Sequence, residues 1–373
     1  MRIVCAALVL LAAGCGKTAS TDEVPALKNA FEGAFLIGTS MNLAQIMGED
    51  RQGVSLIKTH FNAITPENHT KWEHIHPQPD TYTFETADRF VEFGEQNGMF
   101  MVGHPLVWHS QTPKWVFEDA AGKPLDREAL LQRMHEHIQT VVGHYKGRIQ
   151  AWDVVNEAIA DDGAMRPSPW YTIIGEDYIE KAFEYAHEAD PDAELYYNDY
   201  GLENSAKRAT AARLIKSLQE KGLRVTAVGT QGHWGFDWPT FDELNQTIAD
   251  FSALGVKLMV TEMEIETLPT NYEGADIEKS EKWTETMDPY RNGFPDDMQR
   301  KLAQRYRELF KVLLDHRDVI TRVTFWGVTD ADSWKNNWPI QGRTNYPLLF
   351  DRQGKPKPAF FSVVELARQE LKE

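Results

Sequence analysis

The stretch Trp152-Asp153-Val154-Val155-Asn156-Glu157 is a run of strand-forming residues that ends in an amide and a carboxylate. The stretch Lys257-Leu258-Met259-Val260-Thr261-Glu262 shows the same pattern later in the chain. Strands of a parallel sheet are covered on both faces, so they are expected to be nearly continuous apolar runs. Polar side chains at the carboxyl ends of such strands are expected where those ends line a site. Both stretches therefore favour a parallel sheet with a functional edge.

The same pattern recurs along the chain, where apolar runs of strand length alternate with longer segments of helical periodicity. The eight predicted strands are residues 35–42, 61–68, 98–108, 148–157, 194–200, 225–234, 257–265 and 320–330. The predicted helices between them include residues 126–143, 176–189, 205–221, 240–254 and 295–316. Strands that alternate with helices imply a parallel sheet.

Eight strand–helix units predict an α/β fold, a (β/α)8 TIM barrel that forms a single domain over residues 27–372. The competing fold, a doubly wound open sheet, usually carries a glycine-rich phosphate turn after its first strand. The first predicted strand ends in Ile37-Gly38-Thr39-Ser40-Met41-Asn42, which has no such turn. A long loop is expected after strand 7, at residues 267–297.

The N-terminus has the composition of an export signal. Arg2 precedes an apolar run at residues 3–13, which is too short for a membrane-spanning helix of about 20 residues. Residues 1–15 are predicted as a signal peptide and residues 16–26 as a flexible tether. Leu11-Ala12-Ala13-Gly14-Cys15 resembles a bacterial lipoprotein processing site. It predicts a membrane-anchored lipoprotein, periplasmic or at the cell surface, with the lipid on Cys15; an ordinary cleaved signal predicts secretion.

The composition narrows the function classes. The chain has 39 Lys and Arg against 56 Asp and Glu, a net charge of −17. This charge argues against nucleic acid as a partner, because phosphate binding requires a basic surface. The 11 Trp residues are many for an acidic globular chain. Indole rings pack in cores, and they also stack on flat, uncharged ligands such as sugar rings.

Glu157 and Glu262 each follow an apolar run, so both are placed at the same mouth of the predicted barrel. Two opposed carboxyl groups, with Asn156 beside one of them, fit glycoside hydrolysis. In that reaction one carboxylic acid protonates the leaving oxygen, and a second carboxylate acts as nucleophile or base. The alternative for either glutamate alone is a structural role as a helix-cap or ion-pair partner.

Further motifs match a known family in order and spacing. They are FNAITPEN (61–68) with Lys71 and Trp72, GHPLVWHSQ (103–111), WDVVNE (152–157), NDY (198–200), GTQGH (229–233), Thr261-Glu262, FWGVTD (325–330) with Trp334, and PLLFD (347–351). With these motifs the chain resembles the family 10 glycoside hydrolases, the endo-β-1,4-xylanase group, over roughly residues 31–367.

The resemblance implies that Glu157 is the general acid/base and Glu262 the nucleophile of a retaining mechanism through a covalent glycosyl-enzyme. In such a mechanism the two carboxyls are about 5–5.5 Å apart, and the acid has a raised pKa while the nucleophile stays ionised. Asn156 is implied to bind the sugar 2-hydroxyl, and His233 to orient the nucleophile. The other substrate-binding residues that the resemblance implies are Glu67, Asn68, Lys71, His104, Trp108, Gln231, Trp326 and Trp334.

The chain departs from the family two residues after the nucleophile, where Glu264 stands in place of the usual Asp. Because Glu is one methylene longer, its support of His233 is expected to shift. The loop 267–297 is expected to shape the leaving-group side or the distal glycone side of the site. His69, His74 and His76 lack a thiolate or a helical His pair at ligand spacing, so no metal site is predicted, and no cofactor.

The sequence therefore predicts an exported endo-1,4-β-xylanase that acts on xylan and xylo-oligosaccharides as a monomer. A β-1,4-glucan or aryl-glycoside hydrolase of the same barrel family is the first alternative, because the room for the extra hydroxymethyl group of glucose is not visible in the sequence. A non-catalytic surface glycan-binding lipoprotein is an alternative of another class. It predicts the loss of one or both glutamates, and both are present.

Overall fold

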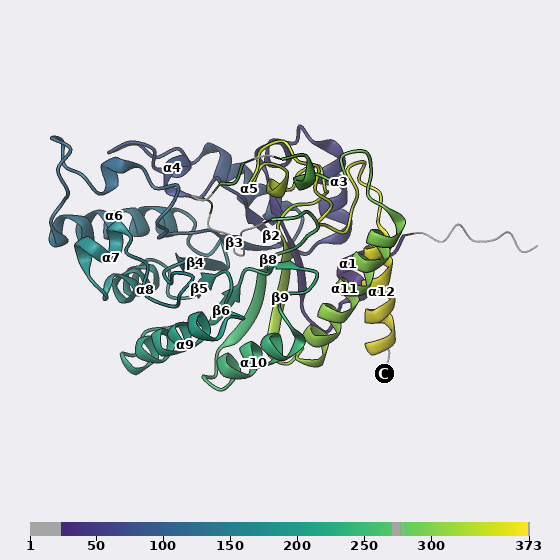
Figure 1. Cartoon of the computed structure of the whole chain (residues 1–373). Helices are drawn as coiled ribbons and strands as arrows, with labels where there is room; N and C mark the ends of the chain where they lie inside the picture. Colours follow the sequence, from purple (N-terminus) through teal and green to yellow (C-terminus); the bar gives the residue numbers. More distant parts are fainter. Residues whose placement is uncertain (1–23, 271–276, 278–279, 283, 372–373) are drawn as a thin grey trace, which may run out of the picture.

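Eight parallel strands close into a barrel in the computed structural model, which describes residues 24–270, 277, 280–282 and 284–371 (Figure 1). The strands follow one another around the barrel in chain order, and β9 closes it by pairing with β1. The barrel strands are β1 (Leu36–Met41), β2 (Ala63–Pro66), β3 (Phe100–Gly103), β4 (Ala151–Asn156), β5 (Glu194–Asp199), β6 (Ala227–Thr230), β8 (Lys257–Glu266) and β9 (Ile320–Phe325). A short ninth strand, β7 (His233–Gly235), pairs only with the end of β8.

One long helix follows each barrel strand and lies outside the barrel (Figure 1). These helices are α3 (Arg51–His60), α5 (Glu85–Gln96), α6 (Arg127–His144), α8 (Tyr178–Ala189), α9 (Ser205–Glu220), α10 (Phe241–Ser252), α11 (Asp296–Asp315) and α12 (Pro358–Glu370). Shorter helices are α1 (Leu27–Ala30), α2 (Leu43–Ile46), α4 (Trp72–Ile75) and α7 (Pro169–Ile174). The described residues also form the single-turn 3-10 helices η1 (Lys114–Val116), η2 (Glu285–Met287) and η3 (Trp334–Asn336).

Local sequence signals start these helices. Asp126 caps α6 by accepting a hydrogen bond from the backbone N–H of Ala129 at 2.8 Å. Thr240 and Glu243 form a reciprocal capping box at the start of α10, which satisfies two otherwise unpaired backbone donors. In α11 the buried residues Leu302, Tyr306 and Leu309 recur at the three- and four-residue spacing of one helix face.

The core has two parts, one between the barrel and the helices and one inside the barrel. The outer part contains the largest buried aromatic side chains, including Trp72, Trp152 and Trp170. The inner part is a separate cluster drawn from five strands, Val102, Ala151, Tyr196, Ala227 and Met259. The interior of the barrel is therefore a packed core and not a pore.

The predicted (β/α)8 barrel is confirmed, and every predicted strand overlaps an observed one. The prediction of one strand over residues 225–234 is wrong in detail, because the chain breaks into β6 and β7 at Gly232. Gly232 has a φ of +83°, and a Cβ there would lie 2.5 Å from Val260. The predicted strands at residues 98–108 and 320–330 extend too far at their carboxyl ends, because β3 ends at Gly103 and β9 ends at Phe325.

The predicted signal at residues 1–15 and most of the predicted tether lie outside the described residues. Within the described part of the chain, no helix is long and apolar enough to cross a membrane. The loop after β8, the seventh barrel strand, leads to α11 and is fastened to the segment 343–345. Arg343 donates to the carbonyl of Pro269 at 2.9 Å, and the N–H of Thr344 donates to Asp288 at 3.1 Å.

Candidate active site

The carboxyl ends of the barrel strands surround a cavity of about 630 Å³. Every site residue predicted from the sequence lines this cavity except Glu264. Glu264 has no exposed surface and lies directly behind His233. Barrel closure thus brings together residues from the ends of β2, β3, β4, β6, β8 and β9 that are far apart in the sequence.

Glu157 directly follows β4 and is 4% exposed. Its Oε2 accepts a hydrogen bond from Trp108 Nε1 at 2.9 Å, and its Oε1 accepts one from Gln231 Nε2 at 2.8 Å. Burial raises the pKa of Glu157 above its ordinary value, and the nearby Glu262 carboxylate adds to this, against the lowering effect of the two hydrogen bonds. A carboxyl group with a raised pKa is suited to donate a proton near neutral pH.

Glu262 lies within β8 and is 5% exposed. Its Oε1 accepts a hydrogen bond from Asn198 Nδ2 at 3.0 Å, and its Oε2 accepts one from His233 Nε2 at 3.2 Å. Burial by itself raises the pKa of Glu262. The hydrogen bond from His233, together with the positive charge of neighbouring groups, outweighs burial and leaves this pKa below its ordinary value. Glu262 therefore stays ionised over a wide pH range.

His233 lies between two carboxylates. Its Nδ1 is 2.7 Å from Glu264 Oε1, and its Nε2 faces Glu262. Burial lowers the pKa of His233, but the hydrogen bonds to Glu262 and Glu264 outweigh it and raise the pKa to about 9. The imidazole is therefore protonated at neutral pH and donates from both nitrogens. The longer Glu264 side chain keeps direct contact with His233, although its extra methylene suggested a shifted support.

A chain of side-chain amides connects the two carboxyl groups. Gln231 Nε2 donates to Glu157 and, at 3.3 Å, to Asn156 Oδ1. Asn198 Nδ2 donates to the same Asn156 oxygen and to Glu262, each at 3.0 Å. Gly229 makes room for Asn198, because a Cβ at Gly229 would lie 2.3 Å from Asn198 Oδ1. The amides fix both carboxyl groups before any ligand enters.

Polar residues after β2 and β3 form another part of the cavity wall. Lys71 Nζ donates to Asn68 Oδ1 at 2.9 Å and to Gln111 Oε1 at 2.8 Å. Burial lowers the pKa of Lys71, against the raising effect of the glutamates around it. His104 Nδ1 is 2.7 Å from the buried carboxylate of Asp153. Glu67 lies in the same wall, and burial raises its pKa.

Three predicted tryptophans wall the cavity. Trp108 packs under the Lys71 ammonium, which lies 4.9 Å from the ring centre. Trp326 meets the His104 ring edge-on at 5.2 Å. Trp334 donates its Nε1 hydrogen to Glu264 Oε1 at 2.7 Å and stacks on Trp338 at 4.6 Å. Flat aromatic rings held in a fixed orientation can stack on the apolar faces of sugar rings.

Sequence reasoning missed the roles of several residues. Asn198 lies in the matched motif NDY, but its contact with Glu262 depends on barrel closure. Asp153 and Gln111 hold His104 and Lys71, and neither had a signal of its own beyond lying in a matched motif. Trp338, Asp332 and Ile277 also line the cavity. Ile277 shows that the loop 267–297 reaches the cavity.

Within the described residues, no group of three or more His, Cys, Asp or Glu side chains is arranged to hold a metal ion. The ring centres of His69 and His74 are 4.8 Å apart, with the rings tilted by 36°, whereas His76 lies against His137, with their Nδ1 atoms 3.2 Å apart. Burial lowers the pKa of His69 and of His76 to about 4. These rings pack with other aromatic side chains, as Trp72 stacks on His137 at 3.5 Å.

The site thus holds two carboxyl groups whose environments shift their pKa values in opposite directions. Such a pair can divide the roles of proton donor and ionised nucleophile. Aromatic rings and amide, imidazole and ammonium side chains surround the pair, as expected for a neutral, hydroxyl-rich ligand. This arrangement fits glycoside hydrolysis.

Comparison with known proteins agrees with this chemistry. Residues 26–366 match the family described as Glycosyl hydrolase family 10. The endo-1,4-beta-xylanase A of Xylanibacter ruminicola is 45% identical over 350 residues, which cover 93% of this chain and 95% of that protein. The solved structure of a family 10 endoxylanase from a sugarcane soil metagenome has a TM-score of 0.89 at 48% identity, covering 91% of this chain and 99% of that one. A mutant solved in complex with xylotriose has a TM-score of 0.82 at 37% identity, covering 91% and 99%. The chain belongs to glycosyl hydrolase family 10.

Proposed function

We propose that the chain is a retaining endo-1,4-β-xylanase that cleaves internal β-1,4-xylosidic bonds of xylan by double displacement. The observation that carries this proposal is the opposite pKa shift of two adjacent buried glutamates, Glu157 raised and Glu262 lowered. The xylanase names of the relatives and the xylotriose bound to one of them support the choice of substrate.

In the first step the Glu262 carboxylate attacks the anomeric carbon while Glu157 gives its proton to the glycosidic oxygen. The bond to the leaving sugar breaks, and a covalent glycosyl ester on Glu262 forms. In the second step Glu157, now ionised, takes a proton from a water molecule. The water oxygen then attacks the anomeric carbon, and the ester bond to Glu262 breaks. This step releases the sugar and returns Glu157 to its protonated form and Glu262 to its ionised form. Each step inverts the configuration at the anomeric carbon, so the product retains the configuration of the substrate.

The surrounding residues supply orientation and charge. Protonated His233 donates to Glu262 Oε2, which keeps Glu262 ionised and holds the orientation of its carboxylate. Asn156 binds the sugar 2-hydroxyl, a contact that strengthens in the transition state. Glu67, Asn68, Lys71, His104, Trp108 and Gln231 bind hydroxyl groups on the glycone side, and Trp326 and Trp334 wall the sugar at the cleavage point. One chain supplies all of these groups, so we propose that a monomer is sufficient.

The first prediction concerns the substrate. The enzyme is expected to release reducing sugar from unbranched xylan much faster than from cellulose, and to produce a mixture of short xylo-oligosaccharides early in the reaction. Equal or faster release from cellulose would favour the β-1,4-glucanase alternative, and xylose as the sole early product would contradict endo cleavage. Binding of both polysaccharides without any release would favour the glycan-binding alternative.

The second prediction concerns export. We propose that residues 1–15 direct export and that Cys15 becomes the lipid-bearing N-terminus. Mass spectrometry of the protein recovered from its native membrane fraction is expected to show an acylated N-terminal Cys15. A soluble protein with an unmodified N-terminus near this position would contradict the anchor and favour ordinary secretion.

A further inference from the structure

Glu157 has an unusual backbone conformation, with a φ of +57°. Non-glycine residues rarely adopt this left-handed region, and a residue held there at a functional site needs surrounding contacts to keep it in place. The conformation turns the chain sharply at the end of β4, so that the Glu157 side chain enters the cavity. The contacts that hold this one residue therefore decide where its carboxyl group lies.

Two hydrogen bonds hold the Glu157 backbone. Its N–H donates to the carbonyl of Asn198 at 2.9 Å, which ties it to β5. Its carbonyl accepts a hydrogen bond from Arg166 Nε at 3.0 Å. A small hairpin brings Arg166 back to this position: Ile159 bridges Met165, and the N–H of Arg166 donates to Ala158 at 2.8 Å.

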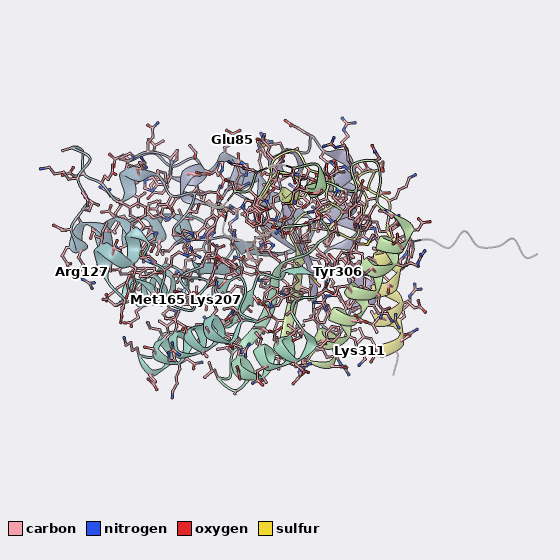
Figure 2. All side chains as sticks on the ribbon, viewed as in Figure 1. Glu85, Arg127, Met165, Lys207, Tyr306 and Lys311 are labelled. Carbon is pink, nitrogen blue, oxygen red and sulfur yellow. The ribbon has the colours of Figure 1, made fainter. Side chains whose placement is uncertain are left out.

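The other end of the Arg166 guanidinium is also fixed. Its NH2 group donates to the Tyr200 hydroxyl at 2.9 Å, and that hydroxyl hydrogen-bonds to Asp161 within the hairpin. Tyr200 is 3% exposed, and Lys207 Nζ lies 3.6 Å from its ring centre. Figure 2 labels Met165 and Lys207, which mark the hairpin and α9. These two elements contact each other, since Thr210 of α9 donates to the carbonyl of Gly163 at 2.7 Å.

We propose that Arg166 is a positioning residue that holds the Glu157 carboxyl in the orientation needed for proton transfer to the glycosidic oxygen. It acts through the Glu157 backbone and not through the substrate, because it does not line the cavity. This role rests on the proposed function of Glu157 as acid/base.

The guanidinium also contributes charge. The charged groups around Glu157 are Glu262 from β8, Arg166 from the hairpin, Lys71 from the segment after β2 and Asp199 from β5. Among them Arg166 lowers the pKa of Glu157, against burial and Glu262. Loss of its charge therefore moves the deprotonation of Glu157, and with it the basic limb of the rate profile, to higher pH.

Arg166→Met tests both effects. With xylotetraose, kcat/KM is expected to fall by about 10–100-fold, the scale of a small misplacement of a catalytic group. With an aryl xylobioside that has a good leaving group, kcat/KM is expected to fall less than threefold, because that bond needs little acid help. The basic limb of the pH profile on xylotetraose is expected to move up. Equal losses on both substrates with an unchanged basic limb would overturn the proposal.

Arg166→Lys separates charge from geometry and keeps the test usable if the Met variant does not fold. The lysine keeps a positive charge, so the basic limb is expected to stay near the wild-type position. An ammonium group does not hold the Glu157 carbonyl and the Tyr200 hydroxyl as the planar guanidinium does, so the loss on xylotetraose is expected to remain. Wild-type rates on both substrates would overturn the proposal.

Arg133→Met is the matched control. Arg133 also donates to backbone carbonyls, at 3.1 Å to Val116 and 3.2 Å to Glu118, but neither of these residues lines the cavity, whereas Glu157 does. Its loss is expected to lower the unfolding temperature without changing the ratio of rates on the two substrates.

If Glu157→Ala itself shows no dependence on the leaving group, the proposed function of Glu157 fails. If Glu157→Ala shows that dependence and Arg166→Met does not, only the role of Arg166 fails.

Discussion

Glu262→Ala is expected to lower kcat on xylotetraose by about 10⁵-fold or more, on the scale seen when another hydrolase loses its covalent nucleophile. The alanine removes the atom that attacks the anomeric carbon, and the groups in direct contact with Glu262 do not replace it. The raised pKa of Glu157 favours its protonated form, which is a poor nucleophile. His233 and Asn198, which both donate to Glu262, offer no carboxylate. Reducing-sugar release over several hours measures the loss.

Glu262→Gln and Glu85→Ala serve as the controls for this variant. The glutamine keeps the size of the side chain and accepts the hydrogen bond from His233, so it is expected to fold like the wild type and still be inactive. Glu85 lies at the start of α5, with an 82% exposed side chain (Figure 2), and its replacement is expected to leave kcat unchanged. Activity of Glu262→Ala within tenfold of the wild type would remove Glu262 from the mechanism.

Glu157→Ala is expected to lower kcat/KM on xylotetraose by about 10²–10⁴-fold, the usual contribution of general acid catalysis. An aryl xylobioside with a good leaving group is expected to keep its first step, because its oxygen departs without a proton. The second step then lacks its base, so the glycosyl-enzyme accumulates and product appears as a burst. Stopped-flow measurement of aryl release shows the burst amplitude.

The pH profile gives a second measurement on the same variant. Glu157 is active in the first step when protonated, and its pKa is raised, so the wild-type kcat/KM is expected to fall as pH rises through that raised value. The acid limb of the same profile arises from protonation of Glu262. Because the pKa of Glu262 is lowered, this limb is expected at a pH below the ordinary pKa of a glutamate. In Glu157→Ala the basic limb is expected to disappear. A retained basic limb, or equal losses on both substrates, would assign the acid to another residue.

The barrel was predictable because its signals are local. Each strand is an apolar run with a polar end, and helices with caps such as Asp126 and Thr240 separate the strands. Strand ends in a closed barrel meet at one mouth, so Glu157 and Glu262 could be placed together from their positions alone. The break between β6 and β7 depends instead on contact between Gly232 and Val260 of the neighbouring strand, which no local pattern shows.

The supporting contacts of the site were not predictable for the same reason. Asn198 reaches Glu262 across 64 residues of chain, and Asp153 reaches His104 across 49. The hairpin that brings Arg166 to Glu157 carries a local turn signal, Asp162-Gly163, but no local pattern shows that Arg166 contacts the Glu157 carbonyl or that Glu157 is left-handed. The sequence indicated the types of residue at the site, whereas their hydrogen-bond partners follow from the packing of distant segments.

The covalent intermediate on Glu262 is the central claim, and trapping it is the most direct test. A 2-deoxy-2-fluoro-xylobioside with a good leaving group slows both steps, because the fluorine destabilises the positively charged transition state, while the leaving group keeps the first step fast enough to be seen. Intact mass spectrometry is expected to show one added fluoroxylobiosyl group per chain, and peptide mapping is expected to place it on Glu262. A label on another residue, or slow turnover with no covalent adduct and an inverted product, would contradict the account.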